Sequence, residues 1–150
     1  MLNKPFEQFE IGETWTSHGR TITESDLVNF AGVSGDFFPL HMDSEYAKNT
    51  RFKQRIAHGM LVLSIGTGLL DMSPKTVVAF YGIEKLRFLQ PTFIGDTIHL
   101  ELRVTDLADK GNGTGVVTFQ QKIKKQTGAT VIAAEYKFLI NTEGASEKSF

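Results

Sequence analysis

The sequence predicts an α+β fold in which a curved antiparallel sheet wraps around one long central helix. The longest uncharged apolar stretch, residues 56–70, has the length of a buried helix, and the chain after it alternates mostly as strands do. An antiparallel sheet must bury one apolar face, and a single central helix can cover that face. Glycines in the stretch, Gly59, Gly66 and Gly68, suit a backbone that packs closely against a curved sheet.

The chain before this helix predicts short elements. Residues 15–22 alternate roughly as a strand would. Thr23 and Asp26 resemble the two ends of a capping box, which opens a short helix. Residues 35–41 are expected to form a loop. Acidic residues then mark the first turn of another short helix over residues 43–47, where the helix dipole favours them.

The central helix is expected from about residue 58 to residue 71, because Ser73-Pro74 ends it. Strands separated by Gly and Pro turns are expected over residues 77–88, 97–105, 115–124 and 130–140. The polar tail, residues 141–150, is expected to be frayed. This arrangement resembles the plan of the hot-dog fold.

Length and composition predict one domain spanning residues 1–150, large enough for a real core. The charged fraction is 22% and the net charge is −1, with acidic and basic residues mixed along the chain. No basic stripe marks a nucleic-acid surface, and no polybasic run marks a membrane surface. The absence of cysteine excludes thiolate catalysis, disulfides and Cys-ligated metals.

The chain shows no targeting or membrane-spanning segment that we can identify. Residues 1–7 lack the apolar core of a signal peptide. Residues 56–70 are too short to span a bilayer. The expected location is therefore cytoplasmic, or an organelle lumen.

Asp36 and His41 are the candidate acid/base pair. Of a carboxylate and an imidazole on one loop, one can act as the acid and the other as the base, because their environments can move their pKa values apart. Pro39 stiffens this loop. The alternative is that Asp36 caps a turn and His41 is a surface residue.

The start of the central helix is the second candidate region. If Gly59 begins the helix, its N–H is free at the positive end of the helix dipole and could hold an oxygen that gains charge. An ordinary helix start is the alternative. Ser64 could contact substrate or orient His41, or bond back to a main-chain carbonyl. His58 and Phe38 are predicted to join Ser64 in binding substrate. No metal site is predicted, since His41 and Asp43 are too few ligands.

Two blocks resemble the MaoC-like dehydratases, the (R)-specific enoyl-CoA hydratase (hydratase 2) group of the hot-dog superfamily. That family carries an Asp-x-Asn-Pro-x-His loop, and the match here is Asp36-Phe37-Phe38-Pro39-Leu40-His41. Its later block, His-Gly-Met-Leu with a serine a few residues on, appears as residues 58–61 and Ser64. The likeness covers nearly the whole chain. One departure is Phe38, where the family has asparagine.

The resemblance implies a hydro-lyase that adds water across the 2,3-double bond of a trans-2-enoyl thioester, or removes it in reverse. It assigns acid/base roles to Asp36 and His41, and the oxyanion site to Gly59. No cofactor is expected, because coenzyme A or acyl carrier protein is part of the substrate. The expected assembly is a homodimer or a higher oligomer. A hot-dog acyl-CoA thioesterase and a non-catalytic acyl-thioester-binding subunit of a heteromeric dehydratase remain as alternatives.

Overall fold

The computed structural model describes residues 1–145 and contains short helices, one central helix and a single large sheet. The helices are η1 (Phe6–Gln8), α1 (Glu24–Ser34), α2 (Pro39–Met42), α3 (Ser44–Lys48) and α4 (Gly59–Gly68). The strands are β1 (Thr14–Thr16), β2 (Arg20–Thr21), β3 (Val77–Phe88), β4 (Thr97–Asp109), β5 (Thr114–Lys125) and β6 (Thr130–Asn141). Of the predicted frayed tail, residues 146–150 lie outside the described residues, and Asn141 is the last residue of β6.

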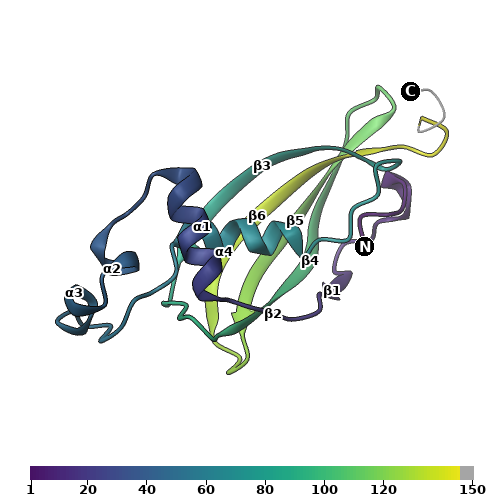
Figure 1. The fold of residues 1–150 in the computed structure, drawn as a ribbon. Helices are drawn as coiled ribbons and strands as arrows, with labels where there is room; N and C mark the ends of the chain where they lie inside the picture. Colours follow the sequence, from purple (N-terminus) through teal and green to yellow (C-terminus); the bar gives the residue numbers. More distant parts are fainter. Residues whose placement is uncertain (146–150) are drawn as a thin grey trace.

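The strands form one antiparallel sheet in the order β1-β4-β5-β6-β3, with β2 also paired to β4. Figure 1 shows the long strands β3–β6 curving past α4, while α1, α2 and α3 gather toward one end of the sheet. The inner face of the sheet is apolar because alternate residues of β4, β5 and β6 are buried. The predicted α+β plan, with a curved antiparallel sheet around a central helix, is confirmed.

Helix α4 packs very closely on the sheet. Leu61, Val62 and Leu63 are buried in the core. A Cβ added to Gly66 would lie 2.4 Å from Cδ1 of Ile123 on β5, so glycine is required for this approach. The helix ends at Gly68 and not near residue 71 as predicted, because residues 69 and 70 tighten into a last turn with i→i+3 hydrogen bonds.

The predicted capping box is confirmed at α1. Thr23 Oγ1 accepts a hydrogen bond from the Asp26 N–H, and the Thr23 N–H donates to Asp26 Oδ2 at 2.7 Å. Asp26 also pairs with the Arg20 guanidinium, which helps to hold the pKa of that carboxyl below its usual range. These contacts define where α1 begins, and therefore where the following loop leaves it.

The prediction of one strand over residues 15–22 is wrong in detail. The structure contains two short strands, β1 and β2, both paired with β4. The Leu100 N–H of β4 donates to the Ser17 hydroxyl. At this point a side-chain oxygen therefore takes the place that a main-chain carbonyl would have in the ladder. Sequence alternation cannot reveal this interruption, because a polar residue is also typical of the outer face of a strand.

Residues 35–41, predicted as a loop, run into a one-turn helix, whereas the short helix predicted over residues 43–47 is confirmed as α3. Pro39 begins the one-turn helix α2, which carries His41, and proline suits the first position of a helix. Asp43 then caps α3 by accepting hydrogen bonds from the main-chain N–H groups of Glu45 and Tyr46. Within residues 1–145, no helix combines the length and apolar character needed to cross a membrane.

Candidate active site

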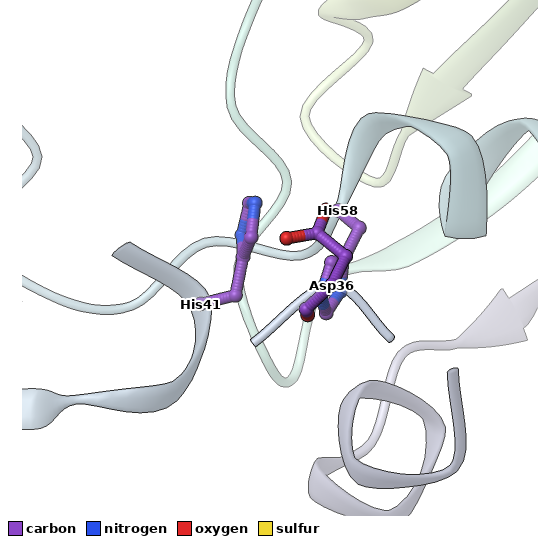
Figure 2. Close-up of side chains that lie close together, drawn as sticks. All are labelled: Asp36, His41 and His58. Carbon is purple, nitrogen blue, oxygen red and sulfur yellow. The ribbon is translucent and has the colours of Figure 1, made fainter. Parts of the chain in front are cut away.

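Three separate segments bring Asp36, His41 and His58 together. Asp36 lies in the loop after α1, His41 lies on α2, and His58 directly precedes α4. One ligand atom of each side chain lies within 4.8 Å of the others, and Figure 2 shows the cluster. The predicted acid/base pair is therefore joined by a third titratable group.

The His41 imidazole is oriented by a main-chain oxygen. Its Nδ1–H donates to the Ile56 oxygen at 2.8 Å, because a carbonyl can only accept. This leaves Nε2 with a free lone pair. Burial lowers the pKa of His41, and the nearby His58 ring also lowers it, while the Ile56 hydrogen bond and the Asp36 carboxylate oppose them. The ring is thus held neutral and able to accept a proton.

Asp36 is exposed and stands just after the left-handed residue Gly35, whose φ is 76°. Its Oδ1 accepts a hydrogen bond from the Phe38 N–H at 3.2 Å. The turn-capping interpretation of Asp36 is therefore correct. It is compatible with proton transfer, since an ionised carboxylate can accept several hydrogen bonds and Asp36 has further lone pairs to use.

His58 positions the other two groups. It is buried, and its Nε2–H donates to the main-chain oxygen of Asp36 at 2.9 Å. Its ring stacks on His41 with centroids 4.0 Å apart, and it packs on Phe30 at 5.0 Å. His58 Nδ1 has no hydrogen-bond partner among the described residues. This arrangement differs from the predicted substrate-binding role of His58.

A cavity of about 350 Å³ opens beside the cluster. It lies between the start of α4, the end of β3 and the start of β6. Its lining is mainly apolar and consists of His41, Arg51, Phe52, Ile56, Ala57, Gly59, Met60, Val62, Phe88, Leu89, Gln90, Pro91, Thr92, Val131 and Ile132. His41 and Gly59 are thus the two predicted site residues that face this space, as expected of a ligand pocket with few polar groups.

Ser64 and Phe38 are absent from this lining. The Ser64 hydroxyl donates to the main-chain oxygen of Met60 at 2.8 Å. This is the alternative in which the serine bonds back to a main-chain carbonyl of its own helix. Phe38 is half exposed and packs edge-on against His41 and Tyr46. Where the resembled family has asparagine, this loop therefore has aromatic packing against the His41 imidazole.

The Asp36–His41–His58 cluster fits proton transfer better than metal binding. Nδ1 of His41 and Nε2 of His58 already donate to main-chain oxygens. Imidazole lone pairs lie in the plane of the ring, and the two rings are stacked with an interplanar angle of 28°. The lone pairs of the two rings therefore lie in nearly parallel planes, which is unfavourable for two imidazoles that bind one tetrahedral ion.

Gly59 is the first residue of α4, where the N–H has no acceptor within the helix. A Cβ added to it would lie 2.7 Å from two carbons of the Phe88 ring at the end of β3. Phe88 also lines the cavity. Glycine at this position therefore allows an aromatic ring to lie directly against the helix start, beside the predicted oxyanion donor.

Gly59→Ala is expected to lower the free energy of unfolding by about 1–3 kcal/mol, the usual cost of overpacking. The Phe88→Ala change should relieve the clash, so the double variant should be more stable than the two single effects predict. Chemical denaturation of all four proteins measures this coupling. Gly68→Ala is the matched control, because a Cβ there meets nothing within 4 Å. Additive effects of the Gly59 and Phe88 changes would contradict the contact.

The central helix of the wrapped sheet begins beside a carboxylate and an imidazole, an arrangement that suits acid/base chemistry. A family model described as the MaoC like domain matches residues 7–127. The chain therefore belongs to the MaoC-like dehydratase family, and its architecture is the predicted hot-dog fold. The predicted enzyme class, a hydro-lyase, is confirmed at the level of this family.

Individual relatives agree with this assignment. The chain is 35% identical over 139 residues to an (R)-specific enoyl-CoA hydratase of Rhodospirillum rubrum, and the match covers 93% of this chain and 93% of that protein. It is 43% identical over 102 residues to Protein MaoC of Klebsiella aerogenes, a match covering 67% of this chain and 30% of that protein.

Solved structures give the same result. The monoamine oxidase regulatory protein from Archaeoglobus fulgius is 44% identical, with a TM-score of 0.87 over 93% of this chain and 95% of that one. The (R)-hydratase from A. caviae is 28% identical, with a TM-score of 0.73 over 91% of this chain and 98% of that one.

Proposed function

We propose that this protein catalyses the (R)-specific hydration of trans-2-enoyl-CoA thioesters to 3-hydroxyacyl-CoA, or the reverse dehydration. The observation that carries the proposal is that His41, whose Nδ1 is bound to the Ile56 oxygen, and Gly59, the first residue of α4, line one apolar cavity, with Asp36 close to His41. A polarised carbonyl and an activated water need these groups at one place. The names of the relatives support the same chemistry.

The reaction would begin with the thioester carbonyl accepting a hydrogen bond from the Gly59 N–H. This polarisation makes C3 electrophilic, and one such donor contributes roughly 2.7–4 kcal/mol. A water held between Asp36 and His41 adds its hydroxyl to C3 and gives its other proton to one member of the pair, and the pair returns one proton to C2. The two additions occur on the same face, so the product is the 3-hydroxyacyl thioester with every atom of water retained.

No separate cofactor enters this scheme, because the carrier of the thioester belongs to the substrate. The apolar lining of the cavity would exclude bulk water and strengthen the hydrogen bonds made inside it. The neutral state of His41, favoured by burial, leaves Nε2 free to bind the reacting water.

A panel of crotonyl-, longer enoyl- and branched enoyl-CoA esters tests the proposal by loss of absorbance at the enoyl thioester chromophore. We expect absorbance loss without release of free thiol. Thiol release from saturated acyl-CoA would instead indicate a thioesterase. Tight ligand binding without turnover by the pure protein would indicate a non-catalytic subunit.

We also propose that the chain forms a symmetric homodimer through β3. This strand stands at one end of the sheet order and pairs only with β6 among the described strands. It exposes several large apolar side chains, and Tyr81 is 56% exposed. Open strand edges invite pairing, and a two-fold operator closes such a contact.

Light scattering at micromolar concentration is expected to give about twice the 16.7 kDa chain mass. Tyr81→Lys should shift the protein toward the monomer, because lysine on an edge opposes pairing. Ile11→Lys is the matched control, since Ile11 is exposed but lies outside β3. A monomeric parent protein would contradict the proposal.

A further inference from the structure

The segment between α3 and α4 carries an unusual concentration of positive charge beside the cavity. Residues 48–55 include the cations Lys48, Arg51, Lys53 and Arg55. Lys48 pairs with Glu45, and Arg55 pairs with Glu24. Within residues 1–145, Arg51 and Lys53 form no ion pair. The local excess of charge is therefore not neutralised by the protein itself.

Arg51 is the cation that reaches the cavity. It lines the same space as His41 and Gly59, and no acidic residue lies in that lining. Its guanidinium stands over the ring of Phe52 with 5.0 Å between the guanidinium carbon and the ring centroid. Phe52 is only partly exposed and also lines the cavity, so the contact holds the guanidinium at the rim.

A guanidinium at the rim of an apolar cavity suits an anionic group at the outer end of a ligand whose inner end is apolar. Arginine binds phosphate with two parallel hydrogen bonds, and it keeps its charge at all working pH values. A thioester substrate carried by coenzyme A or by acyl carrier protein has this form. Its acyl end is apolar, and its pantetheine arm ends in phosphate.

Resting on the proposed function, we infer that Arg51 binds the phosphate at the end of the pantetheine arm, which coenzyme A and acyl carrier protein share, and is a substrate-binding residue. The contact lies away from the reacting carbons, so it acts on substrate binding and not on the chemical step. Removing it should raise KM and leave kcat unchanged, the pattern expected for a contact made equally in the ground and transition states.

Crotonyl esters of pantetheine, 4′-phosphopantetheine and coenzyme A test this inference with the parent protein and Arg51→Ala. For the two phosphorylated esters, KM should rise roughly tenfold in Arg51→Ala, the factor expected for one charge-assisted hydrogen bond. KM for the pantetheine ester, which has no phosphate, should stay the same. A rise for the coenzyme A ester alone would overturn the inference, because it would assign the contact to the nucleotide phosphates and not to the phosphate of the pantetheine arm.

Lys48→Ala is the matched control, because it removes one positive charge from the same segment outside the cavity lining. It should leave all three KM values within about twofold, as expected for a screened surface charge. Equal changes for all three esters in Arg51→Ala, or no change for any of them, would overturn the inference.

A binding measurement separates failure of this inference from failure of the proposed function. If the parent protein hydrates none of the esters, the proposed function fails. Calorimetry with free coenzyme A then tests Arg51 alone, and Arg51→Ala should weaken binding roughly tenfold. Arg51→Lys should retain part of the affinity, because a point charge replaces a bidentate fork. Equal affinity in all three proteins would overturn the inference independently of turnover.

Discussion

Asp36→Asn and His41→Ala should each lower kcat for enoyl-CoA hydration by about 10²-fold or more, the usual contribution of general acid–base catalysis. Asp36→Asn keeps the size of the side chain and its turn-capping oxygen, but it removes the basic carboxylate. His41→Ala removes the free Nε2 that faces the cavity. Circular dichroism should show folded protein in both cases, because Asp36 is exposed and His41 lies on a one-turn helix.

Matched controls separate chemistry from loss of charge. Asp43→Asn removes a carboxylate nearby, and asparagine caps α3 as well as aspartate does. His18→Ala removes an exposed imidazole. Both variants should keep parental activity. Full turnover by Asp36→Asn or His41→Ala would refute their assignment as the acid/base pair.

The pH profile of kcat/KM gives a second measurement on His41. Burial lowers its pKa, so the neutral form persists below the usual value of about 6.5 for histidine. Hydration requires the neutral ring as proton acceptor. The acid limb of the parent profile should therefore fall below that value, and it should change shape in His41→Ala.

His58→Ala is expected to lower the free energy of unfolding by about 2–4 kcal/mol, as for other large-to-small changes in a core. It should also lower kcat by roughly 10- to 100-fold, since a displacement of about 1 Å can cost this much. Two contacts are lost together: the hydrogen bond to the Asp36 oxygen and the stack on His41. Urea denaturation and single-turnover kinetics measure the two effects.

His58→Gln tests whether the lost activity reflects positioning. Glutamine retains an N–H donor, so part of kcat should return even if stability does not. His99→Ala is the matched control, because His99 lies on β4 next to Glu101 and away from the cluster. A His58→Ala protein that is less stable but has parental kcat would show that His58 only fills space.

The proximity of Asp36 and His41 and the main elements could be predicted from the sequence because they depend on local patterns. An uncharged apolar stretch of helical length predicted α4, and the alternation of apolar and polar residues predicted the four long strands. The Thr23–Asp26 box marked the start of α1, since its hydrogen bonds join residues only three apart. The spacing of Asp36 and His41 around Pro39 was enough to nominate them, because both lie within one short segment.

The roles of His58, Gly59 and Arg51 required the tertiary structure. In the sequence, His58 is simply the neighbour of the candidate oxyanion donor Gly59. In the structure, its ring hydrogen-bonds to the main-chain oxygen of a residue 22 positions earlier, stacks on His41 and packs against Phe30. The sequence does not show why residue 59 is glycine. The structure does, because the ring of Phe88 at the end of β3 leaves no room for a Cβ there. Arg51 is one of several exposed cations in the sequence, and only the fold places it on the cavity.

The difference has one physical reason. Local propensity, capping and hydrophobic periodicity act between residues that are close in the chain, so the sequence by itself determined α1, α3, α4, the four long strands and the closeness of Asp36 and His41. Contacts between distant segments depend on how closely α4 approaches the sheet, and that distance is set by packing at Gly66 and Ile123. The cavity and the orientation of the groups around it therefore depend on the tertiary packing of the sheet against α4, and local sequence patterns do not determine them.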